Sequence, residues 1–398
     1  MVSDTSMATR PHKPRTLIFS QRNIFGKALF RCALYEFEDV ISQIDHAEIV
    51  APRADPLHFR NQLANRLAFH APVALRPSLQ KLPVNGQYDL FLAICGSPRD
   101  LLMVDAAKPW REACKTSICL IDELWVTQMD NHRHFLRALQ DFDLVVMYYS
   151  QSVDALHKLT GRKCVFVPPG VDSILFCPYP TPPRRVVDVF SVGRRSAITH
   201  QALLRMTDEN KIFYLHDSIA GDQCMNPVEH RALYANIAKR SRYFIVNPGL
   251  IDRPETRGTQ IEVGNRYFEG AAAGTIMIGE LPANGEFERL FDWPGSVYHL
   301  PYNSSEIEAI INELDSQPEK QESIRQTNIV QALTRHDWAY RWEAILKHVG
   351  LEPLPELLKR KEHLKSLAES VLLKSSPGEE QRKDTTRRES EDISTVRR

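Results

Sequence analysis

A single carboxylate stands where a predicted helix runs into a buried strand. In the segment 265–279, small residues and Gly274 follow Glu269, and the apolar run Thr275–Ile278 comes next. Glycine often ends a helix in the left-handed conformation, so Gly274 predicts a helix stop directly before a strand. The helical period puts Glu269 at the border of the apolar arc, where we expect it to be half-buried. Proteins of the α/β class bind ligands at the mouth of the sheet, so Glu269 is a candidate ligand-binding group.

The start of this helix is predicted from a capping pattern. Thr259 and Glu262 have the spacing of a capping box, in which the two side chains bond to each other's backbone N–H groups. We therefore expect the helix to begin after Thr259. Arg266 follows Glu262 by four residues, so the two side chains are expected to pair on the helix surface.

Cationic side chains flank the same segment and suit an anionic ligand. Arg194 follows the predicted strand Val186–Val192 and Gly193. A guanidinium group is permanently charged and forked, which suits phosphate oxygens. A solvated turn or a plain surface loop is the alternative explanation for these residues. The candidate binding residues are Arg194, His200, Arg257, Arg266 and Glu269.

Two adjacent acids, Asp122 and Glu123, follow the apolar run Ser117–Ile121. Carboxylates at the carboxyl end of a strand suit a general base that accepts a proton from a hydroxyl group. They suit a capping role at the next helix equally well. Both are candidate catalytic residues on this basis.

The sequence does not indicate a metal site or a common nucleotide-binding loop. His132 and His134 are two residues apart, and no Asp-x-Asp pair follows a strand. The Gly-x4-Gly-Lys and Gly-x-Gly-x-x-Gly fingerprints are absent, which argues against kinases and dehydrogenases. We therefore expect no metal and no cofactor.

Short apolar runs separated by helical stretches predict parallel sheets that are covered on both faces. Two such sets are divided by the break at Pro168–Gly170, so we expect an α/β fold of two Rossmann-like domains facing a cleft. The predicted units are a flexible N-terminus (1–15), an N-terminal domain (16–170), a C-terminal domain (171–350) and a charged, largely disordered tail (353–398). The predicted strands are 16–20, 48–51, 88–94, 117–121, 144–147, 164–167, 186–192, 243–246 and 275–278.

Bulk composition restricts the partners of the chain. Its 398 residues carry no formal net charge at pH 7, so no global field favours nucleic acid. Seven scattered cysteines form no Cys-x-x-Cys pair and are expected to be buried free thiols. Neither a signal-peptide core nor a transmembrane run is recognised, so we expect a cytoplasmic protein without a transmembrane segment.

Three motifs resemble group 1 (family 4) glycosyltransferases over roughly residues 117–278. They are the helix around Glu269 with its small residues and Gly274, the Gly193–Arg194 turn, and the interdomain signature Gly170–Pro178 with Val171, Asp172 and Phe176. Within the group the chain looks most like the spore-coat-type branch. Pro169 replaces the usual Asn of the interdomain signature.

This resemblance implies a GT-B fold and a nucleotide-sugar site in the C-terminal domain. It implies that Glu269 accepts hydrogen bonds from the ribose hydroxyls and that Arg194 contacts the diphosphate. The family's upstream Glu is replaced by Ile261, and its Lys by Thr199. These departures put the family's standard chemistry in question.

The leading hypothesis is a glycosyltransferase of hexosyltransferase type, which acts without a metal in polysaccharide or glycoconjugate biosynthesis. It would move a sugar from a nucleotide-diphosphate donor, which is a substrate and not a cofactor, to an unknown carbohydrate, lipid-linked or protein acceptor. One alternative is a catalytically degenerate GT-B protein that binds nucleotide sugars or serves in assembly. The other is a nucleotide-sugar epimerase of the same fold.

Overall fold

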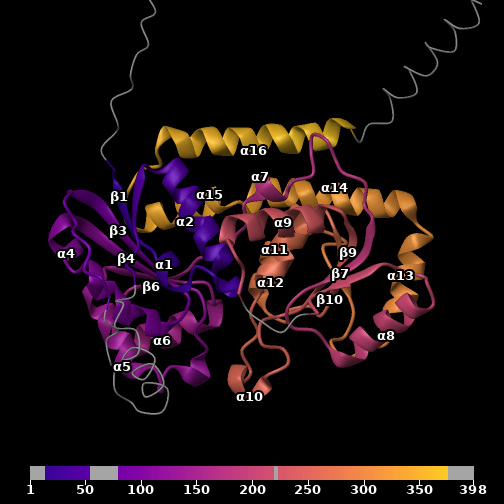
Figure 1. The fold of residues 1–398 in the computed structure, drawn as a ribbon, viewed down its shortest axis with the longest axis horizontal. Coiled ribbons are helices and arrows are strands. Elements are labelled where there is room, and N and C mark those ends of the chain that lie inside the picture. Colours follow the sequence, from indigo (N-terminus) through magenta and orange to yellow (C-terminus); the bar gives the residue numbers. More distant parts are fainter. Residues whose placement is uncertain (1–13, 54–78, 219–222, 375–398) are drawn as a thin grey trace, which may run out of the picture.

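Two parallel β-sheets form the centres of two lobes in the computed structural model (Figure 1), which describes residues 14–53, 79–218 and 223–374. Six strands in the order β2-β1-β3-β4-β5-β6 form the N-terminal sheet. Hydrophobic side chains cover both faces of this sheet, which explains why its strands are continuous apolar runs. The strands are β1 (Thr16–Phe19), β2 (Ala47–Val50), β3 (Tyr88–Cys95), β4 (Cys114–Ile121), β5 (Leu144–Met147) and β6 (Cys164–Phe166).

Helices surround the N-terminal sheet, and α2 (Cys32–Ile44), the longest of those in the described part of this domain, packs on one face of the sheet. The other α-helices are α1 (Arg22–Phe25), α4 (Trp110–Ala113), α5 (Arg133–Leu136) and α6 (Val153–Thr160). The 3-10 helices are η1 (Leu29–Arg31), η2 (Pro98–Ala107), η3 (Val126–Gln128), η4 (Arg137–Asp141) and η5 (Ser150–Ser152).

The C-terminal sheet has five parallel strands in the order β11-β10-β9-β7-β8. Because β7 comes first in the chain, the strand order reverses between β7 and β9, and loops after these two strands diverge there. The strands are β7 (Val187–Ser191), β8 (Tyr214–His216), β9 (Ser241–Val246), β10 (Ile276–Gly279) and β11 (Tyr298–His299). The helices are α7 (Ser173–Phe176), α8 (Ala197–Asp208), α9 (Pro227–Lys239), α10 (Pro254–Arg257), α11 (Asn265–Ala272), α12 (Gly285–Leu290), α13 (Ile307–Asp315) and α14 (Pro318–Arg335).

The chain passes between the domains twice, and the two connecting segments, at Val171 and at His336–Trp338, lie side by side. The Val171 N–H donates to the carbonyl of His336 (3.1 Å), and the Trp338 N–H donates to the carbonyl of Val171 (3.2 Å). Gly170 packs so closely that an added Cβ would lie 2.7 Å from the Trp338 ring, so no larger residue fits without movement. Asp172 caps α7 by accepting two backbone N–H groups.

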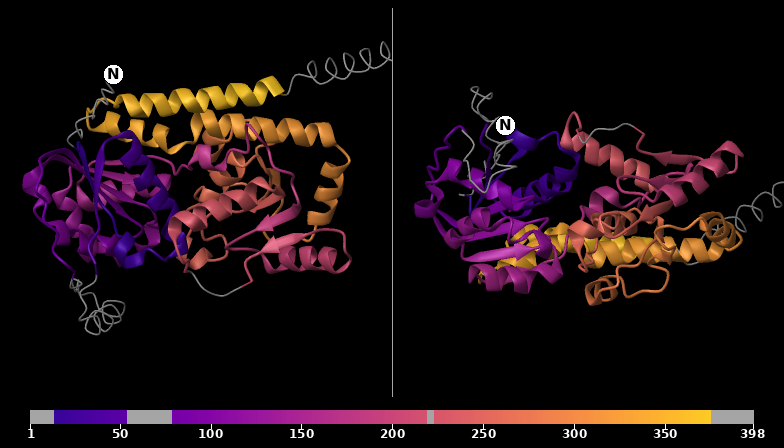
Figure 2. Two further views of the ribbon diagram at one scale, coloured as in Figure 1. Left: turned by 45° about the horizontal axis from the view of Figure 1, so that its top comes forward. Right: turned by 90° about the horizontal axis from the view of Figure 1, so that it is seen from below.

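The chain returns to the N-terminal domain after α14. Helix α15 (Trp338–His348) lies inside the predicted range 171–350, yet its side chains pack into the N-terminal core. Trp338 stacks on Phe37 of α2 with ring centroids 4.6 Å apart. Figure 2 shows the C-terminal helices running along both lobes.

Helix α16 (Pro355–Lys374) corrects the prediction of a disordered tail from residue 353 onward. It lies along the top of both lobes in Figure 1. Leu357 packs in the N-terminal core, and Leu364 and Val371 pack in a cluster with residues of α14. The apolar positions lie on one helical stripe, while the charged face is exposed, and this charge led to the wrong prediction. Residues 375–398 of that tail and residues 1–13 of the predicted flexible N-terminus lie outside the described residues.

The helix that carries Glu269 begins later than predicted. Helix α11 starts at Asn265 after Gly264, and residues 259–264 form a loop. The predicted capping box at Thr259 is therefore wrong. The predicted stop is confirmed, because Gly274 follows the helix with a left-handed φ of 62°.

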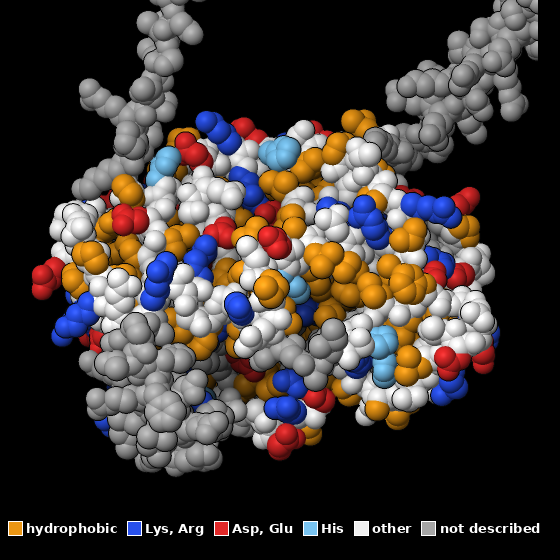
Figure 3. Space-filling model, viewed as in Figure 1, with side chains coloured by type: hydrophobic (Ala, Val, Ile, Leu, Met, Phe, Trp, Pro, Cys, Tyr) orange, Lys and Arg blue, Asp and Glu red, His pale blue; other side chains and the backbone are white. Residues whose placement is uncertain are grey.

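Two covered parallel sheets joined by a hinge form two Rossmann-like domains, which is the expected GT-B fold. Basic and acidic side chains are interspersed on the face shown in Figure 3, in keeping with the absence of net charge. Within the described ranges, no helix combines the length and the apolar character that crossing a bilayer requires.

Candidate active site

A cavity of about 460 Å³ lies between the two domains. Its C-terminal wall includes the turns after β7 and β9, Val192–Arg194 and Asn247–Leu250, at the point where the strand order reverses. Its N-terminal wall includes Asp122–Glu123 after β4 and Tyr148–Tyr149 after β5. Open α/β sheets bind ligands at such a point, and the volume is in the range of small-molecule sites. This cavity is therefore the candidate active site.

Glu269 lines the C-terminal wall and is 1% exposed, so the prediction that it is half-buried is wrong. Arg231 donates to its Oε1 (2.5 Å), and Arg266 and the Tyr234 hydroxyl donate to its Oε2 (2.8 and 3.0 Å). Burial raises the pKa of a carboxyl group, but the charges of Arg266 and Arg231 outweigh burial and lower the pKa of Glu269 to about 2. Glu269 is therefore ionised at neutral pH.

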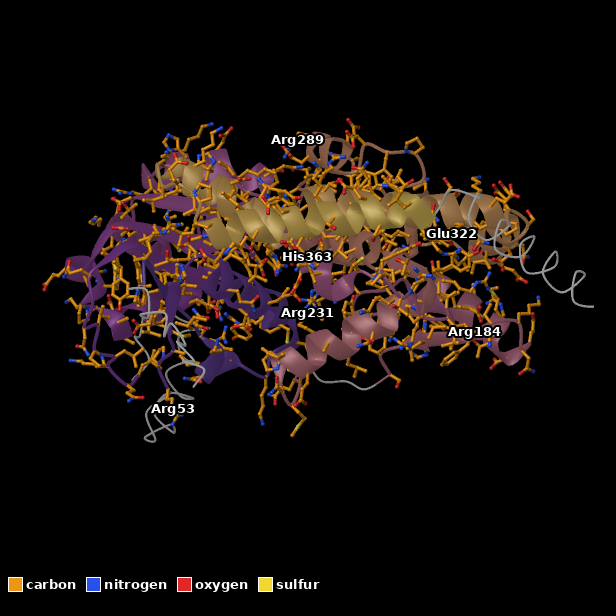
Figure 4. All side chains as sticks on the ribbon, turned by 90° about the horizontal axis from the view of Figure 1, so that it is seen from above. Arg53, Arg184, Arg231, Arg289, Glu322 and His363 are labelled. Atoms are coloured by element: carbon orange, nitrogen blue, oxygen red, sulfur yellow. The ribbon has the colours of Figure 1, made fainter. Side chains whose placement is uncertain are left out.

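Arg231 on α9 links Glu269 to the N-terminal domain. Its Nε and Nη2 donate to the two carboxylate oxygens of Glu36 on α2 (2.7 and 3.1 Å). Glu36 also accepts from the backbone N–H of Asp172 and from the indole N–H of Trp338, both at 2.9 Å. Burial would lower the pKa of Arg231, but the charges of Glu36 and Glu269 outweigh it and raise that pKa. Figure 4 labels Arg231 between the two lobes, where this buried ionic chain joins the cavity wall to the hinge.

Arg266 turns its free edge toward the cavity. Its Nη1 is bound to Glu269, and its guanidinium group lies 5.2 Å from the centre of the Tyr234 ring. Its Nη2 is 3.9 Å from the position that a Cβ on Gly193 would occupy, and its side chain is 35% exposed. A cation therefore lies beside the Gly193 turn, and Glu269 fixes its orientation.

Arg194, in the turn after β7, also lines the C-terminal wall of the cavity. Its Nη1 lies 3.0 Å from both carboxylate oxygens of Asp252, and its side chain is 40% exposed. Exposed ion pairs of this kind contribute little free energy. A bound anion could therefore replace Asp252 at small cost.

The two acids of the N-terminal wall differ in their surroundings. Glu123 accepts a hydrogen bond from the indole N–H of Trp125 (2.7 Å). Among the described residues, the Asp122 carboxylate has no hydrogen-bond or ion-pair partner, although its backbone N–H donates to the Cys95 carbonyl (2.8 Å). Burial, and then the charge of Glu123, raise the pKa of Asp122 to about 7. Asp122 therefore combines a carboxylate without a described partner with a pKa suited to proton transfer near neutrality.

Two of the predicted binding residues do not line the cavity. His200 on α8 places its Nδ1 3.0 Å from the Tyr214 hydroxyl and lines a separate, smaller hollow. Arg257 donates to the carbonyls of Gly258 (3.3 Å) and Gln260 (3.2 Å), and so holds its own loop. The structure therefore brings together Arg194, Arg266 and Glu269 of the predicted set, with Asp122 and Glu123 opposite them.

The residues that depart from the family pattern have structural roles. The Thr199 hydroxyl donates to the carbonyls of Tyr302 (3.1 Å) and Ser304 (2.8 Å), and it is not part of the cavity wall. The Ile261 carbonyl accepts from the Gln151 side chain (3.1 Å). Neither residue lines the cavity.

Glu262 holds the two domains together instead of capping α11. It is 2% exposed, and it accepts from the backbone N–H groups of Ser150 (3.1 Å) and Gln151 (3.0 Å) in the N-terminal domain. Gln260 supports it with a further hydrogen bond (2.8 Å). The predicted pairing of Glu262 with Arg266 is wrong, because Arg266 pairs with Glu269.

Sequence reasoning missed Arg231, Tyr234 and Glu36. Arg231 and Tyr234 are three residues apart on α9, so they reach Glu269 from the same helix face. No local motif marks them, because Glu36 and Glu269 lie 195 and 38 residues from Arg231. Only the fold brings these residues together.

Comparison with known proteins supports the class of the C-terminal domain. Residues 197–347 match the family model described as "Glycosyl transferase-like". This region is therefore similar to that family, and the match covers less than half of the chain. No comparison tests the resemblance to the spore-coat-type branch, which stays a prediction.

Several solved structures are similar to the chain, whereas no curated protein matches it. Anabaena Alr3699/HepE in complex with UDP-glucose shares 14% identity at a TM-score of 0.48, with 84% of this chain and 99% of that chain covered. An alpha-glucosyltransferase in complex with UDP and DNA shares 10% identity at a TM-score of 0.47, and the match covers 85% of this chain and 100% of that chain. S. aureus TarM shares 9% identity at a TM-score of 0.42, and the match covers 65% of this chain and 55% of that chain.

Proposed function

We propose that the protein is a glycosyltransferase that moves a sugar from a nucleoside diphosphate to the hydroxyl group of an unidentified acceptor. One observation carries the proposal: Arg194 and Arg266 line one wall of the cavity, and the carboxylate of Asp122, which has no partner in the described part of the chain, lines the other. Anion binding and proton removal are the two tasks that sugar transfer to a hydroxyl group requires. The match of residues 197–347 to a glycosyl transferase-like family supports the same class.

In the proposed donor complex, Arg194 and Arg266 bind the diphosphate. The free edge of Arg266 and the weakly paired Arg194 supply charge-assisted N–H donors to its oxygens. Glu269 holds Arg266 in place, and three of its roughly four acceptor positions are occupied. Oε1 of Glu269 keeps one acceptor position, so Glu269 can accept from one ribose hydroxyl rather than from two.

Asp122 is the proposed general base. The acceptor oxygen forms a bond to the anomeric carbon, the bond from that carbon to the diphosphate breaks, and Asp122 takes the hydroxyl proton. The leaving diphosphate keeps the electron pair and is stabilised by the two arginines. Glu123 is assigned a positioning role, because its carboxylate is bound to Trp125.

The same assignment predicts metal-independent chemistry with no added cofactor. Two guanidinium groups supply the positive charge that a divalent cation supplies in other phosphate-binding sites. We also propose a cytoplasmic location, since all seven cysteines are free thiols, as is usual in a reducing compartment.

The test is mass-spectrometric analysis of reactions that contain the full chain, a UDP-, GDP- or ADP-linked sugar and a mixture of acceptors. Release of nucleoside diphosphate together with a product heavier by one sugar, unchanged by EDTA, is expected. Nucleotide binding without release would instead indicate the degenerate binding protein. Conversion of the donor to an epimeric nucleotide sugar would indicate the epimerase.

A further inference from the structure

Two cysteines from different domains meet beside the cavity. The Sγ atoms of Cys32 and Cys224 lie 3.8 Å apart, although the residues are 192 positions apart in the chain. Cys32 is the first residue of α2 in the N-terminal domain, and Cys224 precedes α9 in the C-terminal domain. The other thiol–thiol contact among the described residues, between Cys95 and Cys119 on neighbouring strands, lies within the N-terminal domain.

The backbone keeps the two thiols together. The Cys224 N–H donates to the carbonyl of Lys27 (2.6 Å), and Ala28 and Gln223 form an antiparallel bridge. A disulfide requires the sulfur atoms to be about 2.0 Å apart, so they must approach each other by less than about 2 Å. The backbone contacts therefore hold the two segments next to each other, with the thiols close to bonding distance.

We propose that Cys32 and Cys224 form a redox-sensitive pair that reacts with low-molecular-weight disulfides such as oxidised glutathione and then links the two domains. Cys224 is half-buried and meets the oxidant first, whereas Cys32 is 1% exposed. Burial, and then the neighbouring Cys224, raise the pKa of the Cys32 thiol to about 12, which keeps it protonated at rest. Cys32 is therefore the second cysteine to react.

The reaction consists of two thiol–disulfide exchanges. The Cys224 thiolate attacks one sulfur of oxidised glutathione, its proton passes to solvent, and one glutathione leaves as a thiolate. Cys32 then loses its proton and attacks the Cys224 sulfur, and the second glutathione leaves. One protein disulfide forms while one oxidised glutathione is reduced to two glutathione molecules.

The position of the pair gives the bond a consequence. Cys32 lies one helical turn before Glu36, which is bound to Arg231 at the domain boundary. Neighbouring residues of the Cys32 segment, Phe30 and Ala33, line the cavity itself. A bond here would hold the two walls at one separation and so hinder opening and closing of the cavity during turnover. This consequence rests on the proposed function, whereas formation of the bond does not.

The experiment is incubation of the full chain with oxidised glutathione, followed by peptide mapping without reduction. The expected result is a linked Cys32–Cys224 peptide with the loss of two hydrogen atoms, a rise in Tm of about 5 °C because a long loop is closed, and reversal by dithiothreitol. Nucleoside diphosphate release should fall about fivefold or more in the linked form. If the link forms but release is unchanged, only the consequence for turnover is overturned.

Serine variants separate the two roles. Cys32→Ser should accumulate a mixed disulfide of glutathione on Cys224, because the second step is blocked. Cys224→Ser should leave Cys32 unmodified. Cys114→Ser, a half-buried thiol elsewhere in the N-terminal domain, is the matched control and should form the link as the natural chain does. Absence of the linked peptide, or a stable glutathione adduct on Cys224 while Cys32 is intact, would overturn the proposal.

Discussion

The two walls of the cavity are built on different principles. On the C-terminal wall the charged groups are already paired: Arg266 and Arg231 with Glu269, Arg194 with Asp252, and Asp217 with Arg195. On the N-terminal wall the Asp122 carboxylate, which lines the cavity together with Tyr148 and Tyr149, has no partner among the described residues. One wall holds fixed charges in fixed directions, and the other holds a group able to change its charge.

This difference indicates which wall is suited to anion binding and which is suited to proton transfer. Buried ions are tolerated only when they are paired and hydrogen-bonded, and pairing fixes their geometry before a ligand arrives. A proton acceptor needs the opposite environment, because pairing with a cation would lower its pKa below the useful range. The walls therefore fit a division of labour between anion binding and proton transfer.

The largest expected effect is on stability and comes from breaking the paired wall. Arg231→Met leaves Glu36 and Glu269 without their shared cation, and removing one partner of a buried ion pair costs about 3–5 kcal/mol. Urea unfolding measures this loss. Arg240→Met, exposed at the end of the same helix, is the matched control. Equal stability of the two variants would refute the structural role of the ionic chain.

Removing the unpaired acid should affect the rate and leave binding intact. Asp122→Asn is expected to lower kcat by about 10²–10³-fold, because general base catalysis is lost, with little change in donor affinity. In the natural chain the rate should rise with pH through about 7, the pKa of Asp122, since the base must be deprotonated. A variant that keeps the rate and the pH profile would remove Asp122 from the mechanism.

Asp122 should also reduce stability above neutral pH. Burial raises the pKa of Asp122 from 3.8 to about 7. The protonated form is therefore favoured in the folded state, and the contribution of Asp122 to the free energy of unfolding is fully present below pH 4 and is lost as the pH rises through 7. Asp122→Asn should therefore become more stable than the natural chain by about 1–2 kcal/mol as the pH increases from 4 to 8. Thermal unfolding at several pH values checks this, and a constant difference would contradict it.

The smallest effect is expected outside the cavity. Arg257→Ala should change donor affinity by less than about twofold, because this side chain bonds only to carbonyls of its own loop among the described contacts. Titration of the nucleotide sugar into this variant provides the measurement. A large loss of donor affinity in this variant would indicate that Arg257 contacts the donor.

Most of the strands were predictable because buried parallel strands are continuous apolar runs, and the run 144–147 coincides with β5. The short strands β8 and β11 were not predicted. The start of α11 was not predictable, because Glu262 satisfies its carboxylate with backbone groups of Ser150 and Gln151, more than a hundred residues away. Helix α16 was missed for a related reason, since its apolar stripe has meaning only beside α14.

The candidate site was predictable where a local pattern carries it. The Gly193–Arg194 turn and the helix stop after Glu269 depend on neighbouring residues, and the structure places them in one cavity. The orientation of Glu269 depends on Arg231, whose contribution exists only in the folded chain. A sequence pattern thus indicated the location of the site but not its charge balance.

The central claim, that the paired wall binds the diphosphate of a nucleotide sugar, is tested most directly by calorimetric titration of UDP-, GDP- and ADP-linked glucose into the full chain. At least one donor is expected to bind, and Arg266→Ala should weaken it about 10–100-fold, because a charge-assisted hydrogen bond to phosphate is lost. Arg289→Ala, an exposed arginine on α12, should bind as the natural chain does. No heat with any donor, or equal affinity of Arg266→Ala and the natural chain, would contradict the account.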